Sequence, residues 1–405
     1  MAVRLLFLLC YLGSTTMALR AHSIIQRRPT LRLSRCGNAN PLRSRAAIEQ
    51  ASRSARRVVL RSDVTIQLQN STDSPSLTTM ATPPECMPIP KGLMRMRTMR
   101  ALWRFTRPHT LIGSAVSIPA LHAFAIDRGT TVAIDLWAKS VLFALAPSLL
   151  INVYIVGLNQ VFDIKADKIN KPNLPLASGE LTRREGVILS LGCLAAGLGF
   201  GCLVPSRLST APLHLTLLGS VLLGTAYSLP PLRLKRFPMA ASLSITTVRG
   251  ALVNWGFFAS ASAIFYAAPW SQLSPRFVAV GLFYLVFGVV IALLKDLPDR
   301  QGDAASGIST FARLGPKTTF QAALIALQAA LIAVSVALGF AATSSGHLFV
   351  ALQRGIAGVV ALSMASLLHL RSRHVDVTDP SSSTAFYMSV WKLFYLTYLI
   401  LPLAR

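Results

Sequence analysis

Apolar residues in this chain occur in long runs, and polar residues gather between the runs. A helix that crosses the hydrocarbon core of a bilayer needs about 20 predominantly apolar residues. Windows of this length, bounded by charges, proline or glycine, predict nine membrane-spanning helices. They run roughly over residues 109–127, 134–158, 187–204, 212–229, 238–262, 275–294, 319–341, 347–369 and 384–403. We therefore expect an all-α, polytopic membrane protein.

Two polar connections are long, and both follow even-numbered spans. They cover residues 159–186, after the second span, and residues 295–318, after the sixth. Because successive spans alternate in direction, both loops should emerge on the same side of the membrane. Each loop opens with a polar residue and spaced aspartates, which is a weak similarity between the two halves of the domain. The sequence therefore predicts that the two loops build one site.

Composition supports the membrane assignment, since 53% of the residues are hydrophobic and 14% are charged. The formal charge of +25 suggests nucleic-acid binding, but 12 of the 40 basic residues precede Cys86. The remaining basic residues lie mostly at span ends and form no stripe with interleaved aromatics, so we expect no nucleic-acid partner. The 5 cysteines form no CxxC or Cys/His pattern and indicate neither a disulfide framework nor a zinc site.

The N-terminal region has the composition of a targeting sequence. Residues 1–18 have the charged start, short apolar centre and small-residue end of a secretory signal. Residues 19–62 are rich in Arg and Ser and nearly free of acids, as transit peptides are. Together they resemble the two-part presequence of plastid proteins in algae with complex plastids; a disordered basic tail is the alternative. Residues 63–95 read as a flexible linker and residues 96–405 as the membrane domain.

Acidic residues are concentrated at two span ends. Of the 11 acids that follow residue 85, 5 fall in two short stretches. The first stretch contains Asn159, Asp163 and Asp167, and the second contains Asp296, Asp299 and Asp303. If the helix of the second span continues through the first stretch, its three polar side chains share one face. The acids of the second stretch, spaced by three and four residues, could converge in the same way.

Carboxylates crowded at a membrane boundary repel one another and lose solvation, so a cation should compensate them. Mg²⁺ prefers oxygen ligands and is usually held by one or two carboxylates together with substrate phosphates. Two clusters suit two Mg²⁺ ions that grip one diphosphate. In the alternative interpretation the acids are solvated loop charges that pair with nearby bases, namely Lys165, Lys168, Lys295 and Arg300.

The two acidic elements, Asn-x-x-x-Asp-x-x-x-Asp and Asp-x-x-Asp-x-x-x-Asp, resemble those of the UbiA superfamily of intramembrane aromatic prenyltransferases. Finer similarity to the homogentisate prenyltransferases of plastids lies in residues 107–110, 167–172, 174–180, 295–303 and 391–395. The resemblance covers roughly residues 100–405 and implies a UbiA-like bundle of about nine transmembrane helices.

The resemblance also implies Mg²⁺ as cofactor and roles for individual residues. Asn159, Asp163 and Asp167 would bind one Mg²⁺ ion, and Asp299 and Asp303 a second, with Asp296 assisting. Asp163, Asp167, Asp299 and Asp303 would be the catalytic carboxylates.

The substrate-binding candidates are mostly basic. Tyr227, Arg233, Lys235 and Arg236 resemble the Tyr-and-basic element that the superfamily places near the diphosphate. The spacing after Tyr227 is longer here, so which base contacts phosphate stays open. Arg107 and Lys295 are further candidates, and each base could instead be a span-end anchor.

Polar residues inside spans are a separate signal. An arginine in mid-span is costly and normally faces a cavity or a partner. Arg249, in the fifth span, would therefore receive the carboxylate of an acceptor such as homogentisate. Asn254 is the second polar residue of that span, and Asn152 in the second span should hydrogen-bond between helices.

The implied reaction is transfer of a prenyl group from a prenyl diphosphate to homogentisate, with loss of carbon dioxide, in a plastid membrane. The donor would be phytyl diphosphate, as in tocopherol synthesis, or solanesyl diphosphate, as in plastoquinone synthesis. Segments of both kinds occur, and we favour phytyl. Two other classes of membrane protein are the alternatives to an enzyme. A secondary transporter should carry helices broken at the membrane midplane rather than acids at span ends. A non-catalytic scaffold has no reason to concentrate its acids.

Overall fold

A computed structural model describes residues 99–204, 206–269 and 274–405. The predicted signal segment, transit segment and linker, residues 1–95, lie outside the described residues.

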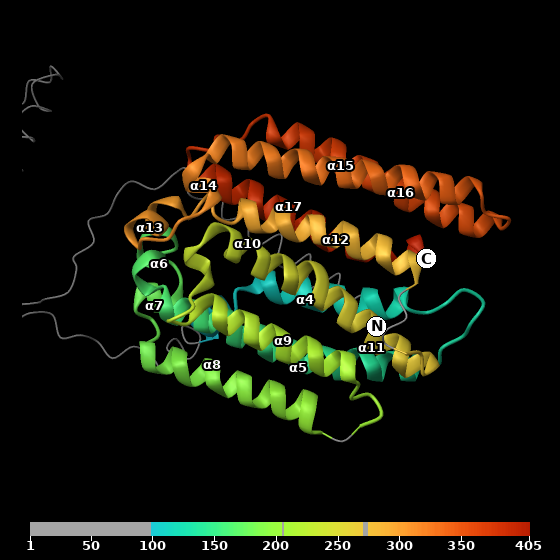
Figure 1. The fold of residues 1–405 in the computed structure, drawn as a ribbon, viewed down its shortest axis with the longest axis horizontal. Coiled ribbons are helices and arrows are strands. Elements are labelled where there is room, and N and C mark those ends of the chain that lie inside the picture. Colours follow the sequence, from blue (N-terminus) through green and yellow to red (C-terminus); the bar gives the residue numbers. More distant parts are fainter. Residues whose placement is uncertain (1–98, 205, 270–273) are drawn as a thin grey trace, which may run out of the picture. The chain divides into compact units, whose positions relative to one another are not determined.

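Within the described residues all regular structure is helical, as predicted (Figure 1). Residues 99–105 are helical as well. The elements that follow are α4 (Pro108–Phe124), α5 (Ile134–Phe162), α6 (Ile164–Asn170), α7 (Pro175–Ser178), α8 (Arg183–Leu198), η1 (Gly199–Leu203), α9 (Ala211–Ser228), η2 (Leu234–Arg236), α10 (Pro238–Thr246), η3 (Thr247–Leu252), α11 (Val253–Tyr266), α12 (Pro275–Leu294), α13 (Arg300–Ala305), α14 (Phe311–Leu314), α15 (Pro316–Thr343), α16 (Leu348–Ser372), α17 (Pro380–Ile400) and η4 (Leu401–Ala404).

Residue types that favour a helix N-terminus stand at the start of several helices. Proline stands in the first turn of α4, α9, α10, α12, α15 and α17, where its missing N–H costs no hydrogen bond. At the start of α8, the Thr182 side chain accepts from the Glu185 amide, and the Glu185 carboxylate accepts from the Thr182 amide. This reciprocal cap satisfies two amides that a helix end otherwise leaves unpaired.

Six helices among the described residues are long and apolar enough to cross a membrane. They are Ile134–Phe162, Arg183–Leu203, Pro275–Leu294, Pro316–Thr343, Leu348–Ser372 and Pro380–Ala404. The other three predicted spans coincide with α4, which has 17 residues, with α9, and with a helix in three pieces. The number nine therefore stays a prediction, whereas the all-helical, multi-span architecture is confirmed.

The fifth predicted span is not one regular helix. Residues 238–262 form α10, the π-helical segment η3 and the start of α11. A π-helical turn widens the helix and changes which backbone groups pair, and such turns occur frequently at functional sites. Gly250 in η3 packs against α12, since a Cβ there would lie 2.8 Å from the Leu285 Cα.

The helices pack around a shared apolar core. α15 and α16 form a pair, α5 packs on α8, and α4 contacts α5, α11 and α17. The centre of the core includes Tyr284 and Phe287 of α12 with Trp391 and Tyr398 of α17, all 1% exposed or less. The outward faces of α15 and α16 expose Ile325, Val336, Phe340, Leu352 and Val359, as expected of helices that face lipid.

The short helices lie at one end of the bundle, where α6 and α7 follow α5, and α13 and α14 follow α12 (Figure 1). α6 packs directly against α13. The prediction that the two long loops lie together on one side is confirmed. Both acidic elements are in these loops.

Candidate active site

The first acidic element contains a helix break that was not expected. α5 ends at Phe162, and α6 begins at Ile164. The Asp163 amide donates to the Gln160 carbonyl at 3.3 Å, a bond three residues back instead of four. The condition under which Asn159, Asp163 and Asp167 would share one helix face is therefore not met, because the last turn of α5 tightens before the chain restarts as α6.

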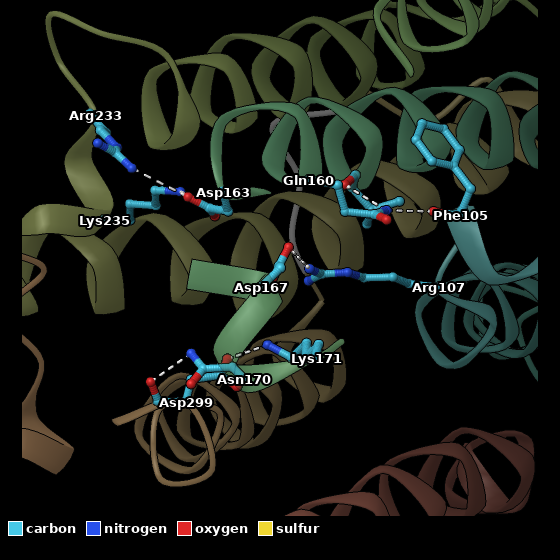
Figure 2. Close-up of polar contacts among 11 residues, drawn as sticks. Phe105, Arg107, Gln160, Asp163, Asp167, Asn170, Lys171, Arg233, Lys235 and Asp299 are labelled. Carbon is cyan, nitrogen blue, oxygen red and sulfur yellow. Dashed lines mark hydrogen bonds and ion pairs between the residues drawn. The ribbon is translucent and has the colours of Figure 1, made fainter. Parts of the chain in front are cut away.

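Gln160 holds this break in place. Its side chain is fully buried, and its amide nitrogen donates to the carbonyl of Phe105 at 2.7 Å (Figure 2). The contact connects the end of α5 to the chain that leads into α4. A buried amide with this partner fixes the entry of both segments into the site.

Asp163 is buried and is contacted by two bases from the segment after α9. Lys235 forms an ion pair with its Oδ1 oxygen, and the Arg233 guanidinium lies 3.4 Å from the same atom (Figure 2). Arg233 has left-handed backbone geometry, with φ 37°. Such geometry is costly for arginine and is typical of functional sites. Of the three bases that follow Tyr227, Arg233 and Lys235 face Asp163, whereas the Arg236 side chain is exposed.

Asp167 is also buried and faces Arg107. A nitrogen of the Arg107 guanidinium lies 3.7 Å from the Asp167 Oδ2 oxygen (Figure 2). Arg107 precedes α4 and shares the left-handed backbone of Arg233, with φ 48°. The Asp167 Oδ2, the Arg107 Nε and the Arg233 Nε are buried and accept or donate no hydrogen bond among the described residues.

The second acidic element is surrounded by lysines. Asp296 pairs with Lys295, whose ammonium lies 5.8 Å from the centre of the Tyr227 ring. Asp299, which precedes α13, pairs with Lys171 from the first loop (Figure 2). Each loop thus supplies a charge to the other.

Asn170 connects the two loops through the backbone. Its side-chain nitrogen donates to the Asp299 carbonyl at 2.7 Å, and its side-chain oxygen accepts from the Gly302 amide at 2.8 Å. A Cβ at Gly302 would lie 2.6 Å from the Ala166 carbonyl oxygen, so only glycine allows this approach of α6 to α13. The relative position of the two acidic elements is therefore set by one amide side chain and one glycine.

Burial leaves part of the negative charge uncompensated. Burial, together with the neighbouring carboxylates of Asp299 and Asp296, raises the pKa of Asp303 to about 7. Burial also raises the pKa of Asp167, although Arg107 and Lys171 act in the opposite direction. Asp303 forms no ion pair with another described residue. A cation delivered to this end of the bundle would stabilise both carboxylates.

The alternative in which the acids pair with bases of their own loops is wrong for most pairs. Among the described residues, Lys165 and Lys168 are exposed and make no ion pair with the acids. Arg300 donates to the backbone carbonyls of Leu297 and Val377. Only Lys295 contacts an acid of its own loop.

The oxygen atoms at this end of the bundle have the chemistry that Mg²⁺ prefers. The described residues contain no group of three or more His, Cys, Asp or Glu side chains that could hold a metal without help. Mg²⁺ bound through one or two carboxylates and substrate phosphates does not need one. The Asp167 oxygen that accepts no hydrogen bond and the Asp303 carboxylate, which has no ion pair among the described residues, supply hard oxygen ligands of this kind. Asn159, one turn before Asp163, is half-buried, and no hydrogen bond of its side chain occurs among the described residues. The residues therefore fit the ion.

Sequence reasoning missed Asn170, Lys171 and Gln160 as site residues. Asn170 and Lys171 lie in residues 167–172, one of the segments similar to plastid homogentisate prenyltransferases, and directly follow Asp167. This position could have identified them as site residues. Gln160 directly follows Asn159, but its inward direction depends on where α5 ends. Arg249 lies away from these ion pairs, with its guanidinium carbon 4.8 Å from the centre of the Trp391 ring. Asn152 hydrogen-bonds to Thr110 and Ser114 of α4, as predicted.

Comparison with known proteins identifies relatives over most of the chain. The UbiA prenyltransferase family matches residues 116–393. The probable homogentisate phytyltransferase 1 of Oryza sativa subsp. japonica is 42% identical over 312 residues, which is 76% of this chain and 74% of the rice protein. The homogentisate solanesyltransferase of Arabidopsis thaliana is 37% identical over 319 residues, covering 76% and 77% of the two chains. A UbiA homolog from Archaeoglobus fulgidus, solved with GPP and Mg²⁺, aligns with a TM-score of 0.50 at 14% identity, over 74% of this chain and 99% of its own.

Proposed function

The chain belongs to the UbiA prenyltransferase family, and from this premise we propose that it transfers a prenyl group from a prenyl diphosphate to homogentisate. The observation that carries the proposal is the pairing of the two acidic elements across α6 and α13, with basic residues around them. Transfer is accompanied by loss of the acetate carboxyl group as carbon dioxide. The product is a methylprenyl-benzoquinol.

The diphosphate would bind among the bases that now contact the aspartates. Arg107 and Arg233 each keep a buried Nε–H without an acceptor among the described residues, next to a carboxylate. A buried donor without a partner is costly, and a phosphate oxygen is a strong acceptor for arginine. Lys171, Lys235 and Lys295 complete the set, with Tyr227 beside Lys295.

Mg²⁺ would be held by Asn159, Asp163 and Asp167 on one side and by Asp299 and Asp303 on the other, with Asp296 assisting. When bound, the ion draws negative charge onto the diphosphate and so makes it a better leaving group. Five bases contact four of the five aspartates before substrate arrives, and Asp303 has no basic partner among the described residues. A magnesium diphosphate adds charges of both signs, so its binding would change the net charge of the site little.

The chain's own residues then act on the leaving group and on the allylic cation. Arg107, Arg233 and Lys235 donate hydrogen bonds to the diphosphate oxygens, where charge develops as the C1–O bond breaks. The surrounding helices exclude water from the cation until the electron-rich ring attacks it. Because the two acidic elements and the bases that contact them lie at one end of the bundle, the prenyl tail extends between the apolar helices.

We further propose that the donor is phytyl diphosphate, as in tocopherol synthesis. In support, identity is 42% and 39% to the phytyltransferases of rice and Synechocystis, while the phytyltransferase and the solanesyltransferase of Arabidopsis are both 37% identical to this chain. The second candidate is solanesyl transfer, as in plastoquinone synthesis. The rice relative is described as chloroplastic, which supports a plastid membrane as the location of this chain. The two-part composition of residues 1–62 adds the proposal of a plastid with several bounding membranes.

The test is a competition assay with the full-length chain in membranes of a heterologous host. Labelled homogentisate and Mg²⁺ are supplied with phytyl diphosphate or solanesyl diphosphate, and products are separated by chromatography. We expect methylphytyl-benzoquinol to dominate. Methylsolanesyl-benzoquinol as the main product would refute the phytyl donor. No product from either donor, with folded protein present, would refute homogentisate as acceptor.

Two matched variants connect the activity to the acidic elements. Asp299→Asn should abolish product formation, because the carboxylate that faces Lys171 loses its charge. Asp135→Asn removes an exposed acid paired with Lys139 and should leave activity unchanged. Equal activity of both variants would contradict the assignment of the site. A transporter would show no turnover in detergent, and a scaffold would tolerate both changes.

A further inference from the structure

Arg249 points into the protein from the interrupted fifth span. It lies in η3, and its guanidinium carbon is 4.8 Å from the centre of the Trp391 ring. Trp391 is 1% exposed, so this contact is inside the bundle. Gly113 of α4 makes room for it, since a Cβ there would lie 3.2 Å from Trp391 and 3.7 Å from the Arg249 Nη1. Three separate segments, α4, η3 and α17, thus meet at this guanidinium.

The Arg249 charge has no acidic partner among the described residues. No ion pair joins it to a carboxylate there, and the groups that act on it electrostatically are the hydroxyls of Tyr387, Tyr395 and Tyr398. Arg249 is half-buried, and a cation inside a bundle without a counter-charge is unfavourable unless something compensates it. The face of Trp391 compensates only in part. The missing partner is therefore an anion.

The surrounding structure holds Arg249 in this position. The Asn254 side-chain nitrogen donates to the carbonyls of Arg249 and Gly250 at 2.8 Å and 3.0 Å. The Tyr398 hydroxyl in turn donates to the Asn254 oxygen at 2.7 Å. These bonds satisfy carbonyls inside the wide π-helical turn and so stabilise it. Asn254, the second polar residue of the span, is thus a positioning residue for Arg249.

The same region reaches the acidic elements. His109 is two residues beyond Arg107, and its ring lies 5.3 Å from that of Trp391. The charged groups that act on His109 are Arg107, Arg249 and Lys171.

Tyr387 provides a second connection from the other side. The charged groups that act on its hydroxyl are Arg249, Lys295 and Asp299. Both side chains therefore lie within the electrostatic reach of Arg249 and of charged residues around the acidic elements, which are Arg107 and Lys171 for His109 and Lys295 and Asp299 for Tyr387. A ligand that bound Arg249 at one end would place its other end near the diphosphate.

We propose that Arg249, supported by Trp391, binds the carboxylate of the aromatic acceptor, and that His109 and Tyr387 contact the acceptor ring between this guanidinium and the diphosphate. The inference rests on the proposed function and adds to it the place and the specificity of acceptor binding. An acid with one aromatic ring fits the site because it supplies the missing anion and a face for the surrounding rings.

The test compares Arg249→Gln with the wild-type chain, both full length and in detergent. The KM for homogentisate should rise about 10- to 100-fold, the effect expected when a charge-assisted bond is lost. The KM for the prenyl diphosphate should stay within about twofold, because Arg249 makes none of the ion pairs around the aspartates. Arg207→Gln, an exposed arginine on a loop, is the matched control and should behave as wild type.

An acceptor without the carboxylate isolates the interaction. With 2-methylhydroquinone in place of homogentisate, wild type and Arg249→Gln should have the same kcat/KM. An unchanged KM for homogentisate in the variant, or an equal loss with both acceptors, would overturn the inference while leaving the prenyltransferase activity established. Absence of product from homogentisate in the wild type would instead refute the proposed function.

A measurement on the wild-type chain alone covers the case in which Arg249→Gln does not fold. Two competitors are compared: a non-reactive analogue of homogentisate as the free acid, and the methyl ester of the same analogue. The ester should inhibit the reaction with homogentisate at least about tenfold more weakly than the acid. Equal inhibition by the ester and the acid would overturn the inference. Arg249→Lys, which keeps the charge but not the planar fork, should give an intermediate KM.

Discussion

Asn170 joins the two acidic elements, and its replacement provides a quantitative test of how the site is assembled. Asn170→Ala removes a donor to the Asp299 carbonyl and an acceptor from the Gly302 amide. Each hydrogen bond contributes about 0.5–1.5 kcal/mol net, so the docking of α6 on α13 loses about 1–3 kcal/mol. If Mg²⁺ must restore this docking when it binds, its apparent affinity falls by about 5- to 150-fold.

The assay is product formation as a function of Mg²⁺ concentration at saturating substrates. We expect the half-saturating Mg²⁺ concentration to rise within that range, with kcat partly recovered at high Mg²⁺. Gly302→Ala should shift the same curve, because its Cβ would meet the Ala166 carbonyl at 2.6 Å. Lys168→Ala, on an exposed position of α6, is the control. A wild-type Mg²⁺ curve for Asn170→Ala, or an equal shift for the control, would refute the reasoning.

Three further outcomes are expected. Gly157→Ala should lower the free energy of unfolding by about 1–3 kcal/mol, because its Cβ would lie 2.4 Å from the Ser190 hydroxyl. Gly192→Ala is the control and should be neutral, because its Cβ would meet no atom within 4 Å. Lys235→Met should cost up to about 3–5 kcal/mol of stability and most of the activity, since it leaves a buried carboxylate without its lysine; Lys139→Met at an exposed pair should change stability by less than about 1 kcal/mol. EDTA should abolish turnover, and excess Mg²⁺ should restore it, while Ca²⁺ should not, because it prefers longer bonds and more ligands; turnover unaffected by EDTA would contradict the metal assignment.

The helical, multi-span class was predictable because hydrophobic length is a local property of the chain. A run such as 275–294 reads as a span wherever it occurs, and α12 covers those residues. The interruption of the fifth span was not predictable in this way. It depends on Gly250 meeting α12 and on Tyr398 reaching Asn254, and both partners come from distant parts of the chain.

The acidic elements show the same division. Their spacing and their place after even-numbered spans were sufficient to predict that Asp163 and Asp299 belong to one end of the bundle. The identity of their basic partners was not predictable. Asp163 pairs with Lys235 and Asp299 with Lys171, across 72 and 128 residues of sequence.

The sequence by itself determined the number of acidic elements, predicted that both lie on the same side of the membrane, and indicated the chemistry that they favour. These depend on residue type, spacing and the alternation of apolar segments, which are all local. Only the tertiary structure decided that the helix breaks at Asp163, that Asn170 joins the loops, and that Arg249 faces Trp391. Each of these depends on a backbone group or ring supplied by another helix, and packing between distant segments selects it.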